Sequence, residues 1–393
     1  MNIKINKTKQ MKTVLSFIDW YMPGYKAGGV LKAFANQVSH FNEDYKFKIV
    51  TRNNDYMETT PYDNVKSDEW NTIDKNVDVF YLSAANVNYG YLKKLVGNID
   101  FDTVYIHGIY SLWFSIMPIY FVKKRKAKKI VVAAHGMLGK HALSVKSGKK
   151  QLFTKASKIL GLYKNVYFHA ANKEEANDVY TVIGKNAKVI IAEEMPMKTE
   201  LAKWKPRVKK KGSLLLASVA RIAPEKNTLY AVEALKNCTD GEITYDIYGP
   251  VYEEEYWAKC QEAIKQLPKN VTVNYKGSIP GDKVLEMLGS VHFMFLPTTG
   301  ENFGHTILES FMASTPVIIS NKTPWQNLEK DKVGWELPLD KKDLFAKIIT
   351  EAANMEQEQY DELSKHSQDY AFNFINDDTI KLQNDVLFNE EML

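Results

Sequence analysis

The chain has 393 residues, of which 45% are hydrophobic and 25% are charged. A soluble chain of this length can bury extended cores and exceeds the size of one ordinary domain, so two domains are expected. Two cysteines without metal-type spacing exclude a disulfide framework and fit a reducing compartment. The first residues lack an apolar core of signal-peptide length, and the longest apolar run, near residues 112–122, is too short to span a bilayer. We therefore expect a cytoplasmic protein that is soluble or lies peripherally on the inner face of the membrane.

Positive charge is concentrated in the first half of the chain. Residues 1–195 hold 29 Lys and Arg against 17 Asp and Glu, whereas residues 196–393 hold 23 against 30. Between Thr103 and Lys173 there are 14 basic residues and no acidic one. The basic residues of this stretch include Lys123, Lys124, Arg125, Lys126, Lys128, Lys129, Lys146, Lys149, Lys150, Lys155, Lys158 and Lys164, and apolar residues such as Phe153, Ile159, Leu160, Leu162 and Tyr163 lie between them. A basic amphipathic segment predicts contact with an anionic membrane surface. A solvated lysine face is the simpler alternative, and no nucleic-acid recognition motif is present, so no nucleic-acid partner is expected.

Short apolar runs alternate with amphipathic stretches of helical length along the whole chain. The predicted strands are, in order, residues 13–18, 47–51, 77–82, 103–106, 130–134, 166–169, 189–191, 214–219, 244–248, 271–275, 291–296 and 317–319. Continuous apolar strands separated by helices indicate parallel sheets that are covered on both faces. The fold class is therefore α/β, with two doubly wound Rossmann-like domains facing across a cleft.

The lysine-rich segment 196–212 contains two prolines and is typical of a linker. It divides the chain into an N-terminal Rossmann-like domain, residues 1–195, and a second Rossmann-like domain, residues 213–370. Residues 371–393 are expected to form a helix that returns toward the first domain. Ligands of such sheets lie outside the carboxyl ends of the strands, so the loops there are the places to search for a site.

Two such loops stand out in the first half. Gly28 and Gly29 follow the first strand and precede a predicted helix, whose N-terminus favours anions. His107 and His135 each end a strand and are each followed by glycine. A strand-end histidine can hydrogen-bond sugar hydroxyls, although a structural histidine is the simpler explanation.

Two more loops stand out in the second half. Arg221 and Lys226 lie in one loop after the strand at 214–219, and their combined charges suit a diphosphate. The segment from Thr299 to Glu309 joins a strand to a helix that begins near Gly304. Free N–H groups at that helix start can meet a phosphate or a hydroxyl group. Glu301 could hold a sugar and Glu309 could accept hydrogen bonds from a ribose, although a lone helix glutamate is usually solvated.

The combination of these motifs resembles the retaining glycosyltransferases of GT-B fold known as group 1, which include bacterial lipopolysaccharide and polysaccharide-assembly enzymes. Glu301 and Glu309, with ENFGHTILESF around them, resemble the family's paired-glutamate signature. SVARIAPEKN is similar to its diphosphate loop, HGML and the Gly28-Gly29 loop match first-domain motifs, and TPWQNL is similar to a variant in polysaccharide-assembly members. The resemblance extends from about Thr13 to Asp340. The approach to the glycines, GYKAGGV, is longer than in some members.

The resemblance implies that residues 1–195 form the acceptor-side domain and residues 213–370 the nucleotide-sugar-binding domain, with a role for each matching position. Arg221 and Lys226 would clasp the donor diphosphate, and Glu309 would bind the ribose. Glu301, with the backbone of Asn302, Phe303 and Gly304, would hold the transferred sugar. In the first domain, His135 would contact that sugar and Gly29, beside Gly28, would lie under the phosphate. Lys276, Gly277, Ser278 and Ile279 would line the base pocket.

The predicted reaction is transfer of a sugar, with retention of configuration, from a nucleotide-diphosphate-sugar donor to a glycan or lipid-linked acceptor. The expected catalytic residues are His135, Glu301, Arg221 and Lys226, with no cofactor and no metal. A nucleotide-sugar epimerase and a non-catalytic nucleotide-sugar-binding protein are alternatives. A metal-dependent transferase that uses Asp100-Phe101-Asp102 is another, although carboxylates in such loops are usually solvated turn residues.

Overall fold

The computed structural model describes residues 11–125, 127, 129–139 and 147–389. The chain forms two compact units, divided after Lys198 and again after Asp377. Residues 199–377 make up the second unit, and the chain from Asp378 onward belongs to the first. We describe each unit by itself.

The first unit is built on a sheet with strand order β3-β4-β2-β1-β5-β6-β7-β8. Its strands are β1 (Thr13–Phe17), β2 (Lys46–Arg52), β3 (Trp70–Asp74), β4 (Val77–Leu82), β5 (Thr103–His107), β6 (Lys129–Ala133), β7 (Tyr167–Ala170) and β8 (Lys188–Ile191). Its helices are α1 (Gly29–Phe41), α2 (Tyr89–Gly97), α3 (Met117–Lys124), α5 (Ser147–Ile159), α6 (Lys173–Val182) and α13 (Asp378–Phe388). Within this sheet β3 pairs antiparallel with β4, and the other pairings are parallel.

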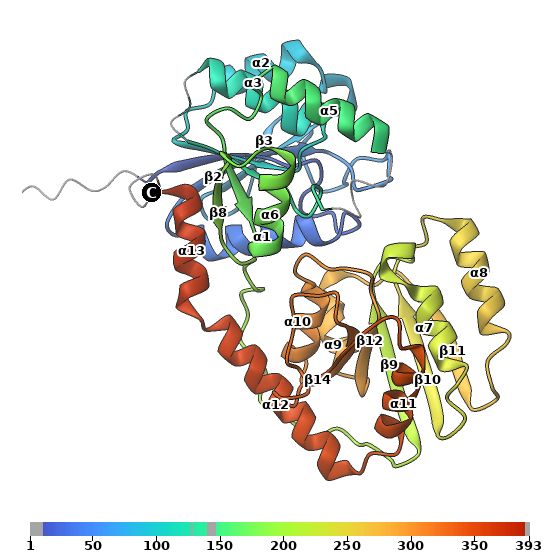
Figure 1. Ribbon diagram of the computed structural model, residues 1–393. Helices are drawn as coiled ribbons and strands as arrows, with labels where there is room; N and C mark the ends of the chain where they lie inside the picture. The colour runs from blue at the N-terminus through green and yellow to red at the C-terminus, as the bar shows by residue number, and fades with distance from the viewer. Residues whose placement is uncertain (1–10, 126, 128, 140–146, 390–393) are drawn as a thin grey trace, which may run out of the picture. The chain divides into compact units, whose positions relative to one another are not determined.

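Helices cover both faces of this sheet, as the continuous apolar strands predict. One face, which carries Leu15 and Ile106, packs against α2, α3 and α6. The opposite face is covered by α1 and α13 (Figure 1). On that face the ring of Phe388 lies 5.6 Å from those of Phe47 and Tyr105. The C-terminal helix is therefore an integral part of the first unit's core.

The second unit has a six-stranded parallel sheet in the order β11-β10-β9-β12-β13-β14. Its strands are β9 (Ser213–Val219), β10 (Glu242–Tyr248), β11 (Val271–Gly277), β12 (Phe293–Leu296), β13 (Val317–Ser320) and β14 (Gly334–Leu337). Its helices are α7 (Thr228–Leu235), α8 (Glu254–Ile264), α9 (Val284–Leu288), α10 (His305–Met312), α11 (Lys342–Ala353) and α12 (Gln357–Ile375). A core that includes Leu216, Val232 and Phe345 joins the central strands to α7 and α11.

The structure shows two strands that the sequence pattern misses. β3 is a short edge strand with largely exposed residues and therefore lacks an apolar run. β14 begins at Gly334, where an added Cβ would lie 2.0 Å from the carbonyl oxygen of Val317. Only glycine allows this close approach of two backbones, so the residue that marks the strand is one that sequence patterns associate with loops.

The domain boundaries also differ from the prediction. Part of the predicted linker 196–212 belongs to the second unit, because the Arg207 guanidinium donates to Ala313 O and to the Tyr360 hydroxyl. The predicted returning helix 371–393 is divided, since α12 ends at Ile375 in the second unit and α13 begins at Asp378 in the first.

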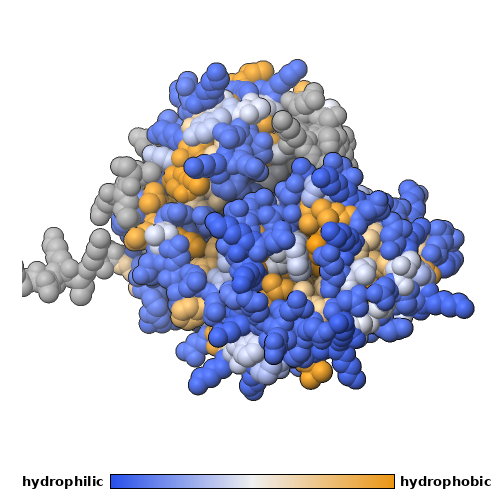
Figure 2. Space-filling model, turned by 60° about the horizontal axis from the view of Figure 1, so that its bottom comes forward, coloured by the Kyte–Doolittle hydropathy of each residue, from blue (hydrophilic) through white to orange (hydrophobic). Residues whose placement is uncertain are grey.

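None of the helices within the described ranges is long and apolar enough to span a membrane. On the face drawn in Figure 2, hydrophobic residues form small patches among hydrophilic ones.

Candidate active site

The glycine loop of the first unit is held by a carboxylate from the segment after β2. Gly28 precedes α1 with φ +79°, a conformation that glycine adopts without strain. The Asp55 carboxylate accepts hydrogen bonds from the backbone N–H groups of Tyr25 at 3.0 Å and Lys26 at 3.2 Å. The loop before Gly28 and Gly29 is thus fixed in place. Asp55 was missed by the sequence reasoning because nothing in its local pattern marks it.

His107 and His135 come together, because His107 ends β5 and His135 follows the end of the neighbouring strand β6. His107 Nδ1 lies 3.0 Å from His135 Nε2, and the two rings are stacked. The His135 side chain is only 7% exposed, so it turns into the unit. Burial, together with the neighbouring His135 and His169, holds the pKa of His107 well below its usual range. His107 is therefore neutral near pH 7.

In the second unit, Arg221 and Lys226 lie in the loop between β9 and α7, as expected. The Arg221 guanidinium is half exposed and pairs with Glu225 at 2.9 Å. The carbonyl oxygen of Glu225 accepts hydrogen bonds from Thr298 and Thr299, which lie in the loop after β12. Glu225 therefore joins the two predicted site loops through its backbone and meets Arg221 through its side chain. The sequence reasoning assigned it no role.

Lys226 and Glu301 form a close ion pair between these two loops. Lys226 Nζ lies 2.6 Å and 2.7 Å from the two carboxylate oxygens of Glu301. The two side chains are 20% and 10% exposed, so water screens this pair only in part. The sequence placed both residues in the site but did not predict that they contact each other.

The segment between Glu301 and α10 is a tight loop supported by aromatic packing. Gly304 has φ +84°, and α10 begins directly after it. The indole N–H of Trp325, which lies in the TPWQNL motif, donates to the carbonyl oxygen of Phe303 at 2.5 Å. The Phe303 ring is buried and lies 5.3 Å from that of Trp325. The contacts of Trp325 therefore support the loop at Asn302, Phe303 and Gly304, which leads directly into the start of α10.

Glu309 is buried, in contrast to the solvated glutamate that is common on helices. Its residue exposure is 4%, and His305, one turn earlier on α10, is buried as well. The structure thus places Glu309 inside the second unit, and its contact with a ribose stays a prediction.

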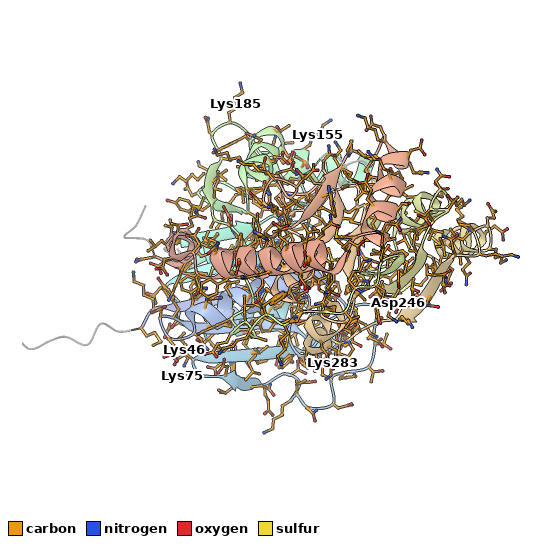
Figure 3. The ribbon with its side chains drawn as sticks, turned by 90° about the horizontal axis from the view of Figure 1, so that it is seen from below. Lys46, Lys75, Lys155, Lys185, Asp246 and Lys283 are labelled. Carbon is orange, nitrogen blue, oxygen red and sulfur yellow. The ribbon has the colours of Figure 1, made fainter. Side chains whose placement is uncertain are left out.

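Two of the four predicted base-pocket residues lie in a strand, whereas the sequence pattern placed all four after it. β11 extends to Gly277, so Lys276 and Gly277 belong to the strand, and Ser278 and Ile279 follow it. Lys276 Nζ lies 3.5 Å from a carboxylate oxygen of Asp246 on β10, a residue labelled in Figure 3. The Gly277 carbonyl accepts a hydrogen bond from the Gly249 N–H at 2.9 Å. An added Cβ at Gly249 would lie 1.8 Å from the Ala220 carbonyl oxygen, which explains the glycine at the end of β10.

The contacts of Asp102 are those of a structural residue, and those of Asp100 are those of a surface residue. The Asp102 carboxylate accepts the backbone N–H of Thr13 at 2.9 Å, and Asp100 lies on the surface 3.9 Å from Arg125. Within the part of the chain that the structure describes, no group of three or more His, Cys, Asp or Glu is placed to hold a metal ion. The expectation of a metal-free reaction stays a prediction.

The predicted basic stretch does not form one continuous lysine face. Lys129 is buried, and its ammonium donates to the carbonyl oxygens of Val386 and Asn389. Arg125 and Lys123 likewise donate to backbone carbonyl groups. Buried Lys129 is therefore a structural residue, which corrects its assignment to a membrane-binding surface, whereas Lys123 is half-buried and Arg125 is exposed. Lys126, Lys128, Lys146 and the side chains of Lys149 and Lys150 lie outside the described residues.

The end of the stretch does present a basic and apolar surface. Lys155 and Lys158 on α5 are exposed, and the Lys155 side chain points away from the molecule (Figure 3). Leu152, Ile159 and Leu160 are 70%, 86% and 81% exposed. By contrast Tyr163, which was expected on this surface, is buried in the core.

Comparison with known proteins shows that the second unit is similar to one family. Residues 200–370 match the model of the glycosyl transferases group 1. This range contains both site loops of the second unit, with the ion pair between Lys226 and Glu301. These residues make up less than half of the chain, so the match is a similarity of the second unit to this family. The two parallel-sheet units have the GT-B fold.

Individual proteins are similar to this chain in sequence or in fold. The 2-deoxystreptamine glucosyltransferase of Streptomyces kanamyceticus is 24% identical over 128 residues, which is 32% of this chain and 32% of the relative's length. The crystal structure of Anabaena Alr3699/HepE in complex with UDP and glucose has a TM-score of 0.66 at 13% identity and covers 95% of this chain and 98% of its own. WaaG, a glycosyltransferase involved in lipopolysaccharide biosynthesis, has a TM-score of 0.65 at 12% identity, with coverage of 95% and 99%.

Proposed function

We propose that the protein is a retaining hexosyltransferase that moves a sugar from a nucleotide-diphosphate-sugar donor to a glycan or lipid-linked acceptor. The observation that carries this proposal is the contact between Lys226 and Glu301 beside the start of α10. In this contact, two neighbouring loops bring together a cation that can bind a phosphate and a carboxylate that can bind sugar hydroxyls. Both residues lie within the range that matches the family model.

Each residue of the second unit receives a role in this proposal. Arg221 and Lys226 stabilise the charge that develops on the leaving diphosphate, which we expect to be the largest protein contribution to the rate. Glu301 and the backbone of residues 302–304 hold the transferred sugar, and Glu309 binds the ribose. Lys276, Gly277, Ser278 and Ile279 line the pocket for the base. In the first unit, the corresponding roles fall to Gly28 and Gly29 for the phosphate and to His135 for the sugar.

The donor and the pathway are part of the proposal. UDP-glucose is the first donor to test, because the Anabaena relative was crystallised with UDP and glucose. WaaG acts in lipopolysaccharide biosynthesis, and we extend this to a role in cell-surface polysaccharide or glycolipid assembly for the present chain.

The test begins with binding and proceeds to turnover. Calorimetry with UDP, GDP, ADP and dTDP identifies the base, and a panel of the corresponding nucleotide sugars with candidate acceptors then identifies the product. NMR of the anomeric proton in the product reports retention or inversion. Loss of donor without acceptor, or change of the donor into a stereoisomer, would favour the epimerase instead. Tight binding with no turnover by any acceptor would favour the non-catalytic alternative.

We further propose that α5 and the residues directly after it attach the enzyme to an anionic membrane surface. Leu152, Ile159 and Leu160 supply exposed apolar area, and Lys155 and Lys158 supply charge on the same segment. Interfacial helices combine these two features, and each basic residue near an anionic leaflet contributes about 1 kcal/mol. Such attachment would bring the enzyme to a lipid-linked acceptor.

Liposome co-sedimentation tests this attachment. We expect binding to vesicles with anionic lipid at low salt and loss of binding at high salt, since exposed charges are screened beyond about 8 Å at physiological strength. Replacing Lys155 and Lys158 by serine should weaken binding, and replacing Leu152 and Ile159 by serine should weaken it further at high salt. Lys185→Ser, at an exposed lysine outside this segment, is the matched control (Figure 3). If the wild-type protein stays in the supernatant with anionic vesicles at low salt, a soluble acceptor is the better proposal.

A further inference from the structure

The turn at His135 and Gly136 has an unusual backbone that one buried carboxylate holds in place. Both residues have positive φ, at +49° and +71°. A left-handed conformation costs a residue with a side chain about 1–2 kcal/mol, so it persists only where its surroundings enforce it. Glu175 on α6 does so, since one of its oxygens accepts the Gly136 N–H at 2.7 Å and the other accepts the Ala171 N–H at 2.8 Å.

Glu175 is itself fixed. It is 4% exposed, and its own backbone N–H donates to the side chain of Asn172, which caps α6. Because Ala171 directly follows β7, the carboxylate of Glu175 joins the turn after β6 to the end of the neighbouring strand. Removing either hydrogen bond would leave a buried N–H unsatisfied, at a cost of about 1–3 kcal/mol.

The His135 ring is held between two groups. Its Nε2 lies 3.0 Å from His107 Nδ1, and its Nδ1 lies 4.0 Å from a carboxylate oxygen of Glu194. Both of these partners are buried. A carboxylate accepts hydrogen bonds and repels a bare nitrogen lone pair, so Glu194 favours the proton on Nδ1. Nε2 is then the acceptor, and the neutral His107 donates to it from Nδ1.

The state of His107 agrees with this arrangement. Its other ring nitrogen, Nε2, is buried and has no hydrogen-bond partner in the structure as described. A lone pair rather than a second N–H lies there when Nδ1 carries the proton. The tautomers of both histidines therefore follow from one carboxylate.

We infer that Glu175 and Glu194 are positioning residues, which fix the backbone and the ring tautomer of His135, the residue proposed to contact the transferred sugar. The inference rests on the proposed role of His135 in the transfer reaction. Neither glutamate matches a motif of the sequence, and neither was assigned a role there.

The tautomer can be measured without any activity. Long-range proton–nitrogen NMR spectra of the full chain with labelled histidine should show a protonated Nδ1 and a bare Nε2 for His135, whose signals are identified by their loss in His135→Gln. In Glu194→Gln the negative charge that favours a proton on Nδ1 is gone, so the form of His135 with its proton on Nε2 should become populated. Glu194→Asp should keep the wild-type tautomer. An unchanged tautomer in Glu194→Gln would overturn the inference even if the transferase assignment holds.

Kinetics tests the consequence. Glu175→Gln and Glu194→Gln should lower kcat by about ten- to a hundredfold, the range that a small misplacement of a reacting group can cause, with donor KM changed less than threefold. Glu174→Gln and Glu193→Gln are matched controls, because each changes an exposed neighbour by the same chemistry. Equal kcat values in the four variants would contradict the positioning role. Thermal unfolding verifies that the variants are folded, and partial recovery of kcat in Glu194→Asp would support the role of the charge.

Discussion

Replacing Lys226 by methionine removes its ammonium group while most of the stem remains. Glu301 then keeps its carboxylate with no cation at 2.6 Å. Removing one partner of a fully buried ion pair costs about 3–5 kcal/mol, whereas exposed pairs contribute about 0–1 kcal/mol. With exposures of 20% and 10%, the pair lies between these limits, and we expect a loss of about 2 kcal/mol in the free energy of unfolding.

The loop offers its own control. Arg221 also pairs with a glutamate, but its side chain is 48% exposed. Arg221→Met should therefore change the stability by less than about 0.5 kcal/mol. The double variant Lys226→Met with Glu301→Gln removes both charges and should recover at least half of the lost stability, because no buried charge remains unpaired. Calorimetry of the unfolding transition of the second unit measures all three variants.

Removing a cation and removing the carboxylate of the ion pair should have opposite effects on the binding of a nucleoside diphosphate. Lys226→Met and Arg221→Met should each weaken the binding of a nucleoside diphosphate by about ten- to a hundredfold, which corresponds to the loss of one charge-assisted hydrogen bond. Glu301→Gln should instead strengthen it by about two- to fivefold, because it removes a negative charge that competes for Lys226. The same variant should lower kcat, since Glu301 is proposed to hold the sugar.

Titration calorimetry with the nucleoside diphosphate, alongside transfer kinetics, measures these effects. Weaker diphosphate binding in Glu301→Gln would show that Glu301 contacts the diphosphate side of the donor, and the division of roles would be wrong. Unchanged affinity in both Lys226→Met and Arg221→Met would remove the basis of the proposed donor site.

Three further predictions concern other parts of the second unit. Glu309→Gln keeps the shape of this buried side chain and should weaken nucleotide binding by about tenfold while the protein stays folded; equal losses for a free diphosphate without a nucleoside would contradict a ribose contact. Activity should survive EDTA, because Arg221, Lys226 and the start of α10 meet the phosphate charge; complete loss that Mn²⁺ restores would refute this. Burial lowers the pKa of His292 to about 4, below the usual 6.5, so the unfolded chain binds a proton there before the folded one does. Stability from this group should be complete above about pH 6.5 and should fall by up to about 3 kcal/mol toward pH 4; His292→Gln should flatten this part of the stability profile.

The sequence predicts the central strands of both sheets well, because strands covered on both faces must be apolar throughout. β1, β5 and β6, for example, consist of buried residues almost throughout and appear as continuous apolar runs. The same rule fails at sheet edges. β3 is polar because solvent reaches it, and β14 depends on the space that Gly334 leaves for Val317. Such strands are set by tertiary contacts that a local pattern does not contain.

The candidate site shows the same division. Arg221, Lys226, Glu301 and Glu309 could be selected from the sequence because loops after parallel strands meet at one edge of a sheet. Their partners could not. Glu225, Asp55 and Glu194 resemble ordinary surface acids in the sequence, and only the fold places them against a cation, a loop or a histidine. Lys129 was misassigned for the same reason, since a lysine in a basic run gives no sign that it will hold the end of α13.

The charge of the second unit illustrates why local placement matters more than composition. Residues 199–377 hold 21 Lys and Arg against 26 Asp and Glu, a net charge of −5, yet this unit is proposed to bind an anionic diphosphate. At physiological salt, charges more than about 8 Å apart in solvent are largely screened, so distant acids affect binding little. The acids that matter are Glu225 and Glu301, which already contact Arg221 and Lys226. A diphosphate must therefore replace these two carboxylates as the partner of Arg221 and Lys226.

When Lys226 turns to the phosphate, Glu301 loses its cation, and a sugar hydroxyl can then donate a hydrogen bond to it. In this arrangement the donor's two halves should bind cooperatively. An intact nucleotide sugar should gain more affinity over its nucleoside diphosphate in the wild type than in Glu301→Gln, and equal gains in both would refute this coupling.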